Sequence, residues 1–226
     1  MNKIEKGLVD YFDRDANTLD IRSNGMYPSG VLSNLCSNAF RIDGLLCSSM
    51  EGFLQSLKHQ DPTKQRQVCQ LKGGNARKRS VTSWQTDQIV WWRGQTIDRQ
   101  GDDYQRLLYR AYQALFDQNE RFKAALMATR GITLTHTTGE EDPYKTILTA
   151  SEFCQILTEI RDNYDKRDKQ IVSKKRIFID TDGQKYELML LPQDYQIHRL
   201  SRSAVWHRRK VGASVGHPRE EQTPAP

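Results

Sequence analysis

The chain has 226 residues, of which 37% are hydrophobic and 27% charged, and its mass is 26.2 kDa. This length fits one domain, with or without an appendage, because domains cluster at roughly 100 to 150 residues. The mean hydropathy of −0.75 and the lack of a long apolar run argue against a transmembrane helix, which needs about 18 apolar residues. Residues 1–10 also lack the apolar run of a secretory signal, so we expect a cytoplasmic protein with no membrane partner.

The formal net charge of +6 is distributed unevenly along the chain. Residues 199–226 hold six Lys or Arg against two Glu, a net charge of +4, which leaves +2 for the first 198 residues. This last segment is also poor in apolar residues, so we expect a basic, disordered tail. Contact of the tail with nucleic acid is an open alternative, and the body of the protein is expected to be nearly neutral.

The cysteines argue against a metal centre. Cys36, Cys47, Cys69 and Cys154 form no C-x-x-C pair and have no His at ligand spacing. We therefore expect reduced thiols, with no metal site, no disulfide framework and no cofactor.

The segment 40–47 predicts a hairpin followed by a helix. Asp43-Gly44 lies between two short apolar runs, which is a strong signal for a tight turn. Ser48 precedes Glu51 by three residues in the pattern of a capping box. Apolar residues then recur at helical spacing, namely Met50, Phe53, Leu54 and Leu57.

A second helix is expected at about 103–116, and a third should begin near Asn119, which is a candidate cap. A further helix should begin at a capping box formed by Thr149 and Glu152 and end at about Tyr164. Residues 132–136 alternate as a half-buried strand does, and residues 176–191 predict a second hairpin around Asp182-Gly183. The fold class expected is α+β: a mostly helical single domain with a small β-sheet, a C-terminal β-hairpin and a disordered tail. The boundaries expected are 1–168 for the domain, 169–198 for the hairpin extension and 199–226 for the tail.

The helix after the first hairpin carries three polar residues at i, i+4 and i+7, namely Glu51, Gln55 and Lys58. They share one stripe beside the apolar stripe, at the edge of the core, where the walls of clefts form. A carboxylate and an amine in a partly dry cleft can perform acid–base or covalent chemistry. The alternative is structural: Glu51 as a capping acid, and a surface ion pair with Lys58.

Two other clusters have both a functional and a structural interpretation. In the loop 71–80, Gly73-Gly74 lies beside Arg77 and other cations, a combination that suits a phosphate. The P-loop pattern is missing, and as a bare motif the loop favours a solvated basic segment. Trp84, Trp91 and Trp92 suit either a platform for stacking a base or simple packing.

Several of these segments together resemble the NADAR or YbiA-like superfamily. The resemblance runs from about Ile21 to Arg161 and includes LSNL at 32–35, FRIDG at 40–44 and ALMAT at 125–129. Its centre is CSSMEGFLQSLK at 47–58, where Ser-x-Glu-x-aromatic-x-Gln-x-x-Lys recurs. The stretches 91–112 and 136–153 depart from the usual Trp-Gly-rich loop.

This resemblance implies an N-glycosidase. Members of the superfamily cleave ribosylamino intermediates of riboflavin synthesis, or remove ADP-ribose from guanine bases in DNA. It implies that Glu51 stabilises an oxocarbenium-like centre or activates water, that Lys58 is a candidate Schiff-base lysine, and that Asp142 is a second carboxylate. For Asp142 the alternative is an ordinary Asp-Pro turn. The expected substrate-binding residues are Ser33, Asn34, Gln55, Gly73, Gly74, Arg77 and Trp92.

The function expected is hydrolysis of an N-ribosyl or ADP-ribosyl linkage, with removal of ADP-ribose from guanine in DNA as the leading hypothesis. The expected partner is ADP-ribosylated DNA or a ribosylated nucleotide. Two alternatives stay open: hydrolysis of a ribosylamino-pyrimidine precursor of riboflavin, and a non-catalytic module that senses ADP-ribose or a related nucleotide.

Overall fold

The computed structural model describes residues 8–173, 176–179, 185–190 and 206–210. The helices are α1 (Ser29–Leu32), α2 (Met50–Ser56), α3 (Pro62–Cys69), α4 (Gly73–Arg77), α5 (Trp84–Asp87), α6 (Asp102–Gln118), α7 (Glu120–Met127) and α8 (Ala150–Ser173). The strands are β1 (Phe12–Asp13), β2 (Thr18–Asp20), β3 (Phe40–Ile42), β4 (Leu45–Cys47), β5 (Ile89–Trp92), β6 (Gln95–Asp98), β7 (Thr133–Thr135), β8 (Arg176–Ile179), β9 (Lys185–Leu190) and β10 (Trp206–Lys210). The fold class is α+β, as expected, and the described strands form four small sheets.

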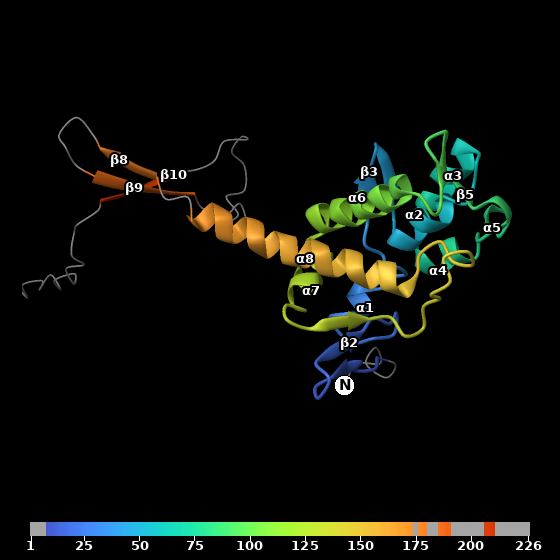
Figure 1. The fold of residues 1–226 in the computed structure, drawn as a ribbon, viewed down its shortest axis with the longest axis horizontal. Helices are drawn as coiled ribbons and strands as arrows, with labels where there is room; N and C mark the ends of the chain where they lie inside the picture. Colours follow the sequence, from blue (N-terminus) through green and yellow to red (C-terminus); the bar gives the residue numbers. More distant parts are fainter. Residues whose placement is uncertain (1–7, 174–175, 180–184, 191–205, 211–226) are drawn as a thin grey trace, which may run out of the picture. The chain divides into compact units, whose positions relative to one another are not determined.

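The chain divides into two compact units, residues 1–163 and 164–226, so the division falls inside α8. In the first unit, α2 lies at the centre and contacts α3, α4, α6 and β4 (Figure 1). The apolar stripe predicted for this helix is buried, since Met50, Phe53, Leu54 and Leu57 are all at most 2% exposed. Burial of this stripe fixes which face of α2 is left for the polar residues.

The N-terminus of α2 differs from the prediction by one residue. Ser49, not Ser48, is the N-cap, and its hydroxyl accepts a hydrogen bond from the Gly52 backbone N–H at 3.1 Å. The Ser49 hydroxyl also donates to the Leu71 carbonyl at 3.1 Å. Because the cap lies one position later, the Glu51 side chain is not the acid of a capping box.

The hairpin predicted at 40–47 is confirmed. Strands β3 and β4 pair antiparallel around Asp43 and Gly44, which both have positive φ (47° and 81°). Two positive φ values in a two-residue loop are typical of a type I′ turn, whose twist matches that of the strands.

A parallel pairing brings distant parts of the chain together at the edge of the first unit. Strand β2 pairs antiparallel with β1 and parallel with β7, with Leu19 opposite Leu134. Both leucines are buried. The residues that follow β2 and β7, Ile21–Asn24 and His136–Thr138, therefore leave the sheet side by side.

The helices predicted near 103–116 and after Asn119 are confirmed as α6 and α7. The Asn119 side chain accepts from the Phe122 N–H, as a cap does. The capping box at the start of α8 is also confirmed, since Thr149 and Glu152 exchange hydrogen bonds of 2.7 and 3.0 Å. The predicted end of α8 near Tyr164 is wrong, because the helix continues to Ser173.

In the second unit, β8 and β9 pair antiparallel, as the hairpin predicted at 176–191 requires. The predicted turn of this hairpin, Asp182-Gly183, lies outside the described residues. Strand β10 pairs antiparallel with the other edge of β9 and completes a three-stranded sheet. The segment 199–226 was expected to be a tail without structure, and β10 corrects that expectation for residues 206–210. Backbone pairing with β9 provides the partner that the sequence of this segment does not reveal.

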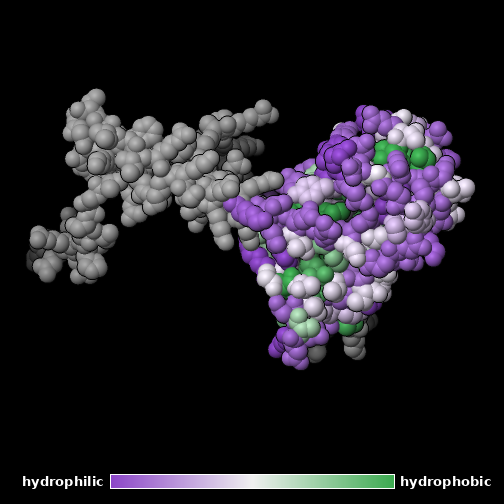
Figure 2. Space-filling view, viewed as in Figure 1, coloured by the Kyte–Doolittle hydropathy of each residue, from purple (hydrophilic) through white to green (hydrophobic). Residues whose placement is uncertain are grey.

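On the face of the first unit seen in Figure 2, hydrophilic residues predominate and apolar residues appear as separate spots. In the part of the chain that the structure describes, no helix combines the length and the apolar character required to cross a membrane.

Candidate functional site

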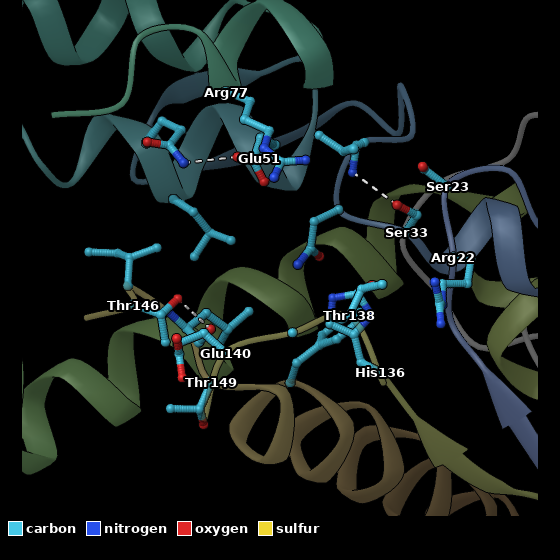
Figure 3. A pocket seen from close by; sticks show the side chains of 18 of the residues that line it. Arg22, Ser23, Ser33, Glu51, Arg77, His136, Thr138, Glu140, Thr146 and Thr149 are labelled. Carbon is cyan, nitrogen blue, oxygen red and sulfur yellow. Dashed lines mark hydrogen bonds between the residues drawn. The ribbon is translucent and has the colours of Figure 1, made fainter. Parts of the chain in front are cut away.

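A cleft of about 650 Å³ opens beside α2 in the first unit (Figure 3). One wall comes from α2 and α4, with Glu51 and Arg77 on it, and the opposite wall carries Glu140, Thr146 and Thr149 from the segment before α8. Six of the predicted site residues line this cleft, namely Ser33, Asn34, Glu51, Gln55, Lys58 and Arg77.

Glu51 is half-buried on the α2 wall. Its backbone N–H donates to the Asn34 carbonyl at 3.0 Å, and its Oε1 accepts from the Gln55 Nε2 at 2.8 Å. The first bond attaches the start of α2 to the segment that carries Ser33 and Asn34. The second orients the carboxylate along the helix, one turn from the amide.

Gln55 is 6% exposed, and its Oε1 has no hydrogen-bond partner among the described residues. A buried acceptor without a donor costs free energy, about 1–3 kcal/mol. Because Gln55 lines the cleft, a donor group of a ligand is a suitable partner for this oxygen.

Lys58 is buried, with 8% of its surface exposed, and lies in the turn just after α2. Its Nζ donates to the Ser80 hydroxyl at 3.0 Å and lies 5.7 Å from the centre of the Trp84 ring. Burial lowers the pKa of Lys58 from 10.5 to about 8, while the Glu51 charge acts in the opposite direction. The neutral amine, which is the form required of a nucleophile, therefore forms at a lower pH than it does in an exposed lysine.

Asn34 and Ser33 follow the short helix α1. The Tyr112 hydroxyl, on α6, donates to the Asn34 Oδ1 at 2.8 Å. Burial raises the pKa of Tyr112 well above 10.0, so this hydroxyl stays a donor. The neighbouring Ser33 Oγ accepts from the Leu35 N–H at 3.3 Å, which orders the turn at the cleft.

Two of the predicted phosphate-binding residues do not line the cleft. Gly73 and Gly74 belong to helix α4, not to an open loop. A Cβ on Gly73 would lie 2.0 Å from the Leu35 carbonyl oxygen, whereas a Cβ on Gly74 meets nothing within 4 Å. The glycine at 73 is thus explained by close backbone packing, and of this segment only Arg77 reaches the cleft.

Trp92 also lies away from the cleft. It is 3% exposed, packs edge-on against Phe53 with ring centres 5.1 Å apart, and donates from its Nε1 to the Asp43 Oδ2 at 2.8 Å. Trp84 is 1% exposed. Trp92 therefore has a packing role and is not a platform for stacking a base, because its buried ring offers no face to a base.

Asp142 is absent from the cleft lining, and its contacts are those of a residue in an ordinary Asp-Pro turn. Its Oδ2 lies 3.0 Å from the Lys145 Nζ, and its Oδ1 accepts from the Tyr144 N–H. The hydrogen bond from Lys145 lowers the pKa of Asp142. The acidic residue of this segment that does line the cleft is Glu140.

Several cleft residues were missed by sequence reasoning, namely Arg22, His136, Lys145 and Thr146. His136 directly follows β7. Its Nδ1 lies 2.7 Å from the Ile21 carbonyl oxygen, and its ring packs edge-on against Phe153. Arg22 follows β2 and its Nε pairs with Asp20 at 2.5 Å. The signal that could have found Arg22 and His136 is their position just after the two paired strands β2 and β7, but the parallel pairing itself was not foreseen.

The wall opposite α2 is held by a buried ion pair. Arg99 is 1% exposed and binds both carboxylate oxygens of Glu152, at 3.0 and 2.7 Å. The Arg99 Nε also donates to the Thr146 carbonyl at 3.2 Å. The start of α8 and the segment with Thr146 are therefore joined through one guanidinium group.

In the described part of the chain, no group of three or more His, Cys, Asp or Glu residues is arranged to hold a metal ion. The four cysteines are free thiols, and Cys47 and Cys69 are fully buried.

The chain belongs to the family of bacteriophage protein GP30.3, which matches it over residues 26–162. It is similar to an uncharacterized 17.1 kDa protein of the Gp30-rIII intergenic region of Enterobacteria phage T4, with 34% identity over 151 residues, covering 64% of this chain and 97% of the relative. It is also similar to the NMR structure of the E. coli protein YbiA, with a TM-score of 0.47 and 17% identity over 63% of this chain and 82% of that chain. The NADAR-like resemblance recognised in the sequence is confirmed by the family match over residues 26–162.

Proposed function

We propose that the protein is an N-glycosidase that hydrolyses an N-ribosyl or ADP-ribosyl linkage, and that it removes ADP-ribose from guanine bases in DNA. The observation that carries the proposal is the α2 wall of the cleft. There a half-buried carboxylate, Glu51, and a buried amine with a lowered pKa, Lys58, line the same cavity. A buried amine with a lowered pKa in a cleft is typical of active sites.

Cleavage of a C1–N bond passes through an oxocarbenium-like centre at C1. A carboxylate stabilises that positive charge, and it can also take a proton from water while the water oxygen bonds to C1. The electrons of the C1–N bond then leave with the nitrogen of the base, which takes up a proton. Glu51 has the charge and the access for either role.

A covalent route uses Lys58. When the ribose ring opens, C1 forms an imine with the nitrogen of the base, and the neutral Lys58 amine adds to C1. The nitrogen of the base then leaves as an amine, with C1 joined to the Lys58 Nζ as a Schiff base. Water hydrolyses this imine, so that the ribose regains its aldehyde and Lys58 its free amine. The pKa of about 8 favours this route.

The rest of the cleft suits a phosphorylated sugar. Arg77 and Lys145 are exposed cations on its lining, and Arg22 lies at the end shared with Ser23 and Ser33 (Figure 3). Arginine and lysine are the side chains that bind phosphate oxygens. The unpartnered Oε1 of Gln55 suits a hydroxyl donor of the ribose.

The test is mass spectrometry of the products from two separate incubations. The first contains an oligonucleotide with ADP-ribose on guanine, and the second contains a ribosylamino-pyrimidine phosphate. Release of ADP-ribose and recovery of unmodified guanine only in the first supports the proposal. Turnover of the second substrate alone would make the protein an enzyme for a riboflavin precursor. Tight binding of ADP-ribose without turnover of either substrate would make it a sensing module.

A further inference from the structure

A second cavity of about 440 Å³ is linked to the cleft by the Lys58–Ser80 hydrogen bond. Lys58 lines the cleft and Ser80 lines the second cavity, so one hydrogen bond of 3.0 Å joins the two linings. The polar residues of the second cavity are His59, Lys64, Gln67, Lys78, Arg79 and Ser80. We call it the basic cavity.

The charge of the basic cavity is of one sign. Lys64 comes from α3, and Lys78 and Arg79 follow α4. Among the described residues, none that lines the cavity is acidic, and none of these three cations forms an ion pair with a carboxylate. Three exposed cations without a counterion create a positive potential that attracts a polyanion.

His59 lines the basic cavity together with these cations. Burial lowers the pKa of His59. The charges of Lys64 and Lys58 act in the same direction, while a backbone hydrogen bond with Arg79 and the charge of Asp61 act in the opposite direction. Its Nε2 is buried and has no hydrogen-bond partner in the described part of the chain. The histidine is thus neutral at physiological pH, and a new anion beside it would raise its pKa.

The remaining lining is apolar and supplied by Val68, Leu71 and Val81. An apolar wall beside unpaired cations suits the sugar and phosphate of a nucleotide unit better than it suits a small inorganic anion. Enzymes that act on a base in nucleic acid take it into a pocket, and the phosphates of the flanking nucleotides then lie next to the pocket mouth.

We propose that the basic cavity binds a backbone phosphate of the nucleic acid strand whose modified base occupies the cleft. Lys78, Arg79 and Lys64 make the phosphate contacts, and Ser80 connects them to Lys58 in the cleft. This inference rests on the proposed function, since it assigns a polymeric substrate to the same enzyme.

The test measures binding of an unmodified, fluorescein-labelled single-stranded 12-mer by anisotropy, so its result does not depend on turnover. In Lys78→Ala with Arg79→Ala, we expect affinity to fall about tenfold. The slope of log K against log salt should fall by about 0.7, the contribution of one phosphate contact on single-stranded DNA. The matched control is Arg14→Ala, which removes an exposed cation from another part of the first unit and should leave affinity and slope unchanged.

Three results would overturn the inference while leaving the proposed function intact. The first is an unchanged salt slope in the double variant. The second is a loss of affinity confined to Arg208→Ala with Arg209→Ala in β10, which would place the DNA contact in the second unit. The third is a double variant that loses binding of 5′-AMP but not of the 12-mer, which would make the cavity a mononucleotide site. If the substrate tests fail but the 12-mer result holds, the proposed reaction is wrong and the nucleic acid site remains.

Discussion

The Gln55 amide donates a 2.8 Å hydrogen bond to the Glu51 carboxylate, one turn earlier in α2, and both side chains line the cleft. The bond places a neutral donor against one carboxylate oxygen, while a different residue, Ser49, caps the helix. The charge of Glu51 is therefore available for chemistry and is not required to start α2.

Glu51→Gln should retain the fold and lower the rate of base release at least about a hundredfold. The amide still accepts a hydrogen bond from Gln55, but it cannot stabilise a cationic C1 or deprotonate water. The measurements are turnover of the modified oligonucleotide and the midpoint of thermal unfolding. Ser49→Ala is the contrasting variant and should lose about 1 kcal/mol of stability with the cap. A large fall in the midpoint for Glu51→Gln would instead assign Glu51 a structural role.

Borohydride added during turnover should trap a covalent adduct on the peptide that contains Lys58. Reduction converts the Schiff base to a stable secondary amine, so the protein gains the mass of the reduced ADP-ribosyl group. Peptide mapping locates the adduct, and Lys58→Arg serves as the control that keeps the positive charge but cannot form it. An untrappable enzyme that retains activity as Lys58→Arg would leave Glu51 and an activated water as the mechanism.

The pH profile of kcat/KM should rise through pH about 8, the pKa to which burial lowers Lys58. The neutral amine is the nucleophile, and its fraction grows as the pH passes this value. Rates measured from pH 6 to pH 10 in buffers of constant ionic strength provide the check. If Lys58 acted only as a cation, activity would fall over the same range as the charge is lost.

Gly73→Ala and Gly74→Ala form a matched pair that tests the packing role of Gly73. The methyl group at 73 would lie 2.0 Å from the Leu35 carbonyl oxygen, so we expect a loss of roughly 1–3 kcal/mol and a raised KM, because Leu35 adjoins Asn34. At 74 the space is open, and alanine within α4 should be neutral or stabilise by up to about 1 kcal/mol. Chemical denaturation measures the free energy of unfolding of both variants. Equal effects would contradict the close approach of α4 to Leu35.

Glu152→Gln should cost roughly 3–5 kcal/mol, because it leaves the Arg99 charge buried without its partner. Burial acts to raise the pKa of Glu152, but the hydrogen bonds from Arg99 and the Thr149 N–H outweigh it and hold that pKa below 4.5. The pair therefore stabilises the native state above pH 4.5, and this stability is lost as the pH falls through the lower native pKa. Between pH 7 and pH 3, the free energy of unfolding should fall more steeply for the wild type than for Glu152→Gln. Parallel curves would exclude this linkage.

Local signals were sufficient for the elements that depend on neighbours in sequence. Asp43-Gly44 predicted a turn because positive φ is a property of those two residues, and Asn119 and Thr149 predicted helix starts because a cap bonds to a backbone N–H three residues away. The i, i+4, i+7 spacing likewise placed Glu51, Gln55 and Lys58 on one stripe. The cap at Ser49 was mispredicted because Ser48 and Ser49 are chemically equal and only the backbone conformation distinguishes them.

Contacts between distant segments decided the rest. Gly73 and Gly74 look alike in the sequence, but one packs on the Leu35 backbone and the other faces open space. Trp92 is distinguished from a stacking residue only by its burial against Phe53, and His136 enters the cleft only because β7 pairs in parallel with β2. The sequence by itself therefore determined the α+β class and the polar stripe of α2, since both follow from local periodicity. The opposite wall of the cleft depended on the tertiary structure, because burial and the pairing of remote strands have no short-range signal.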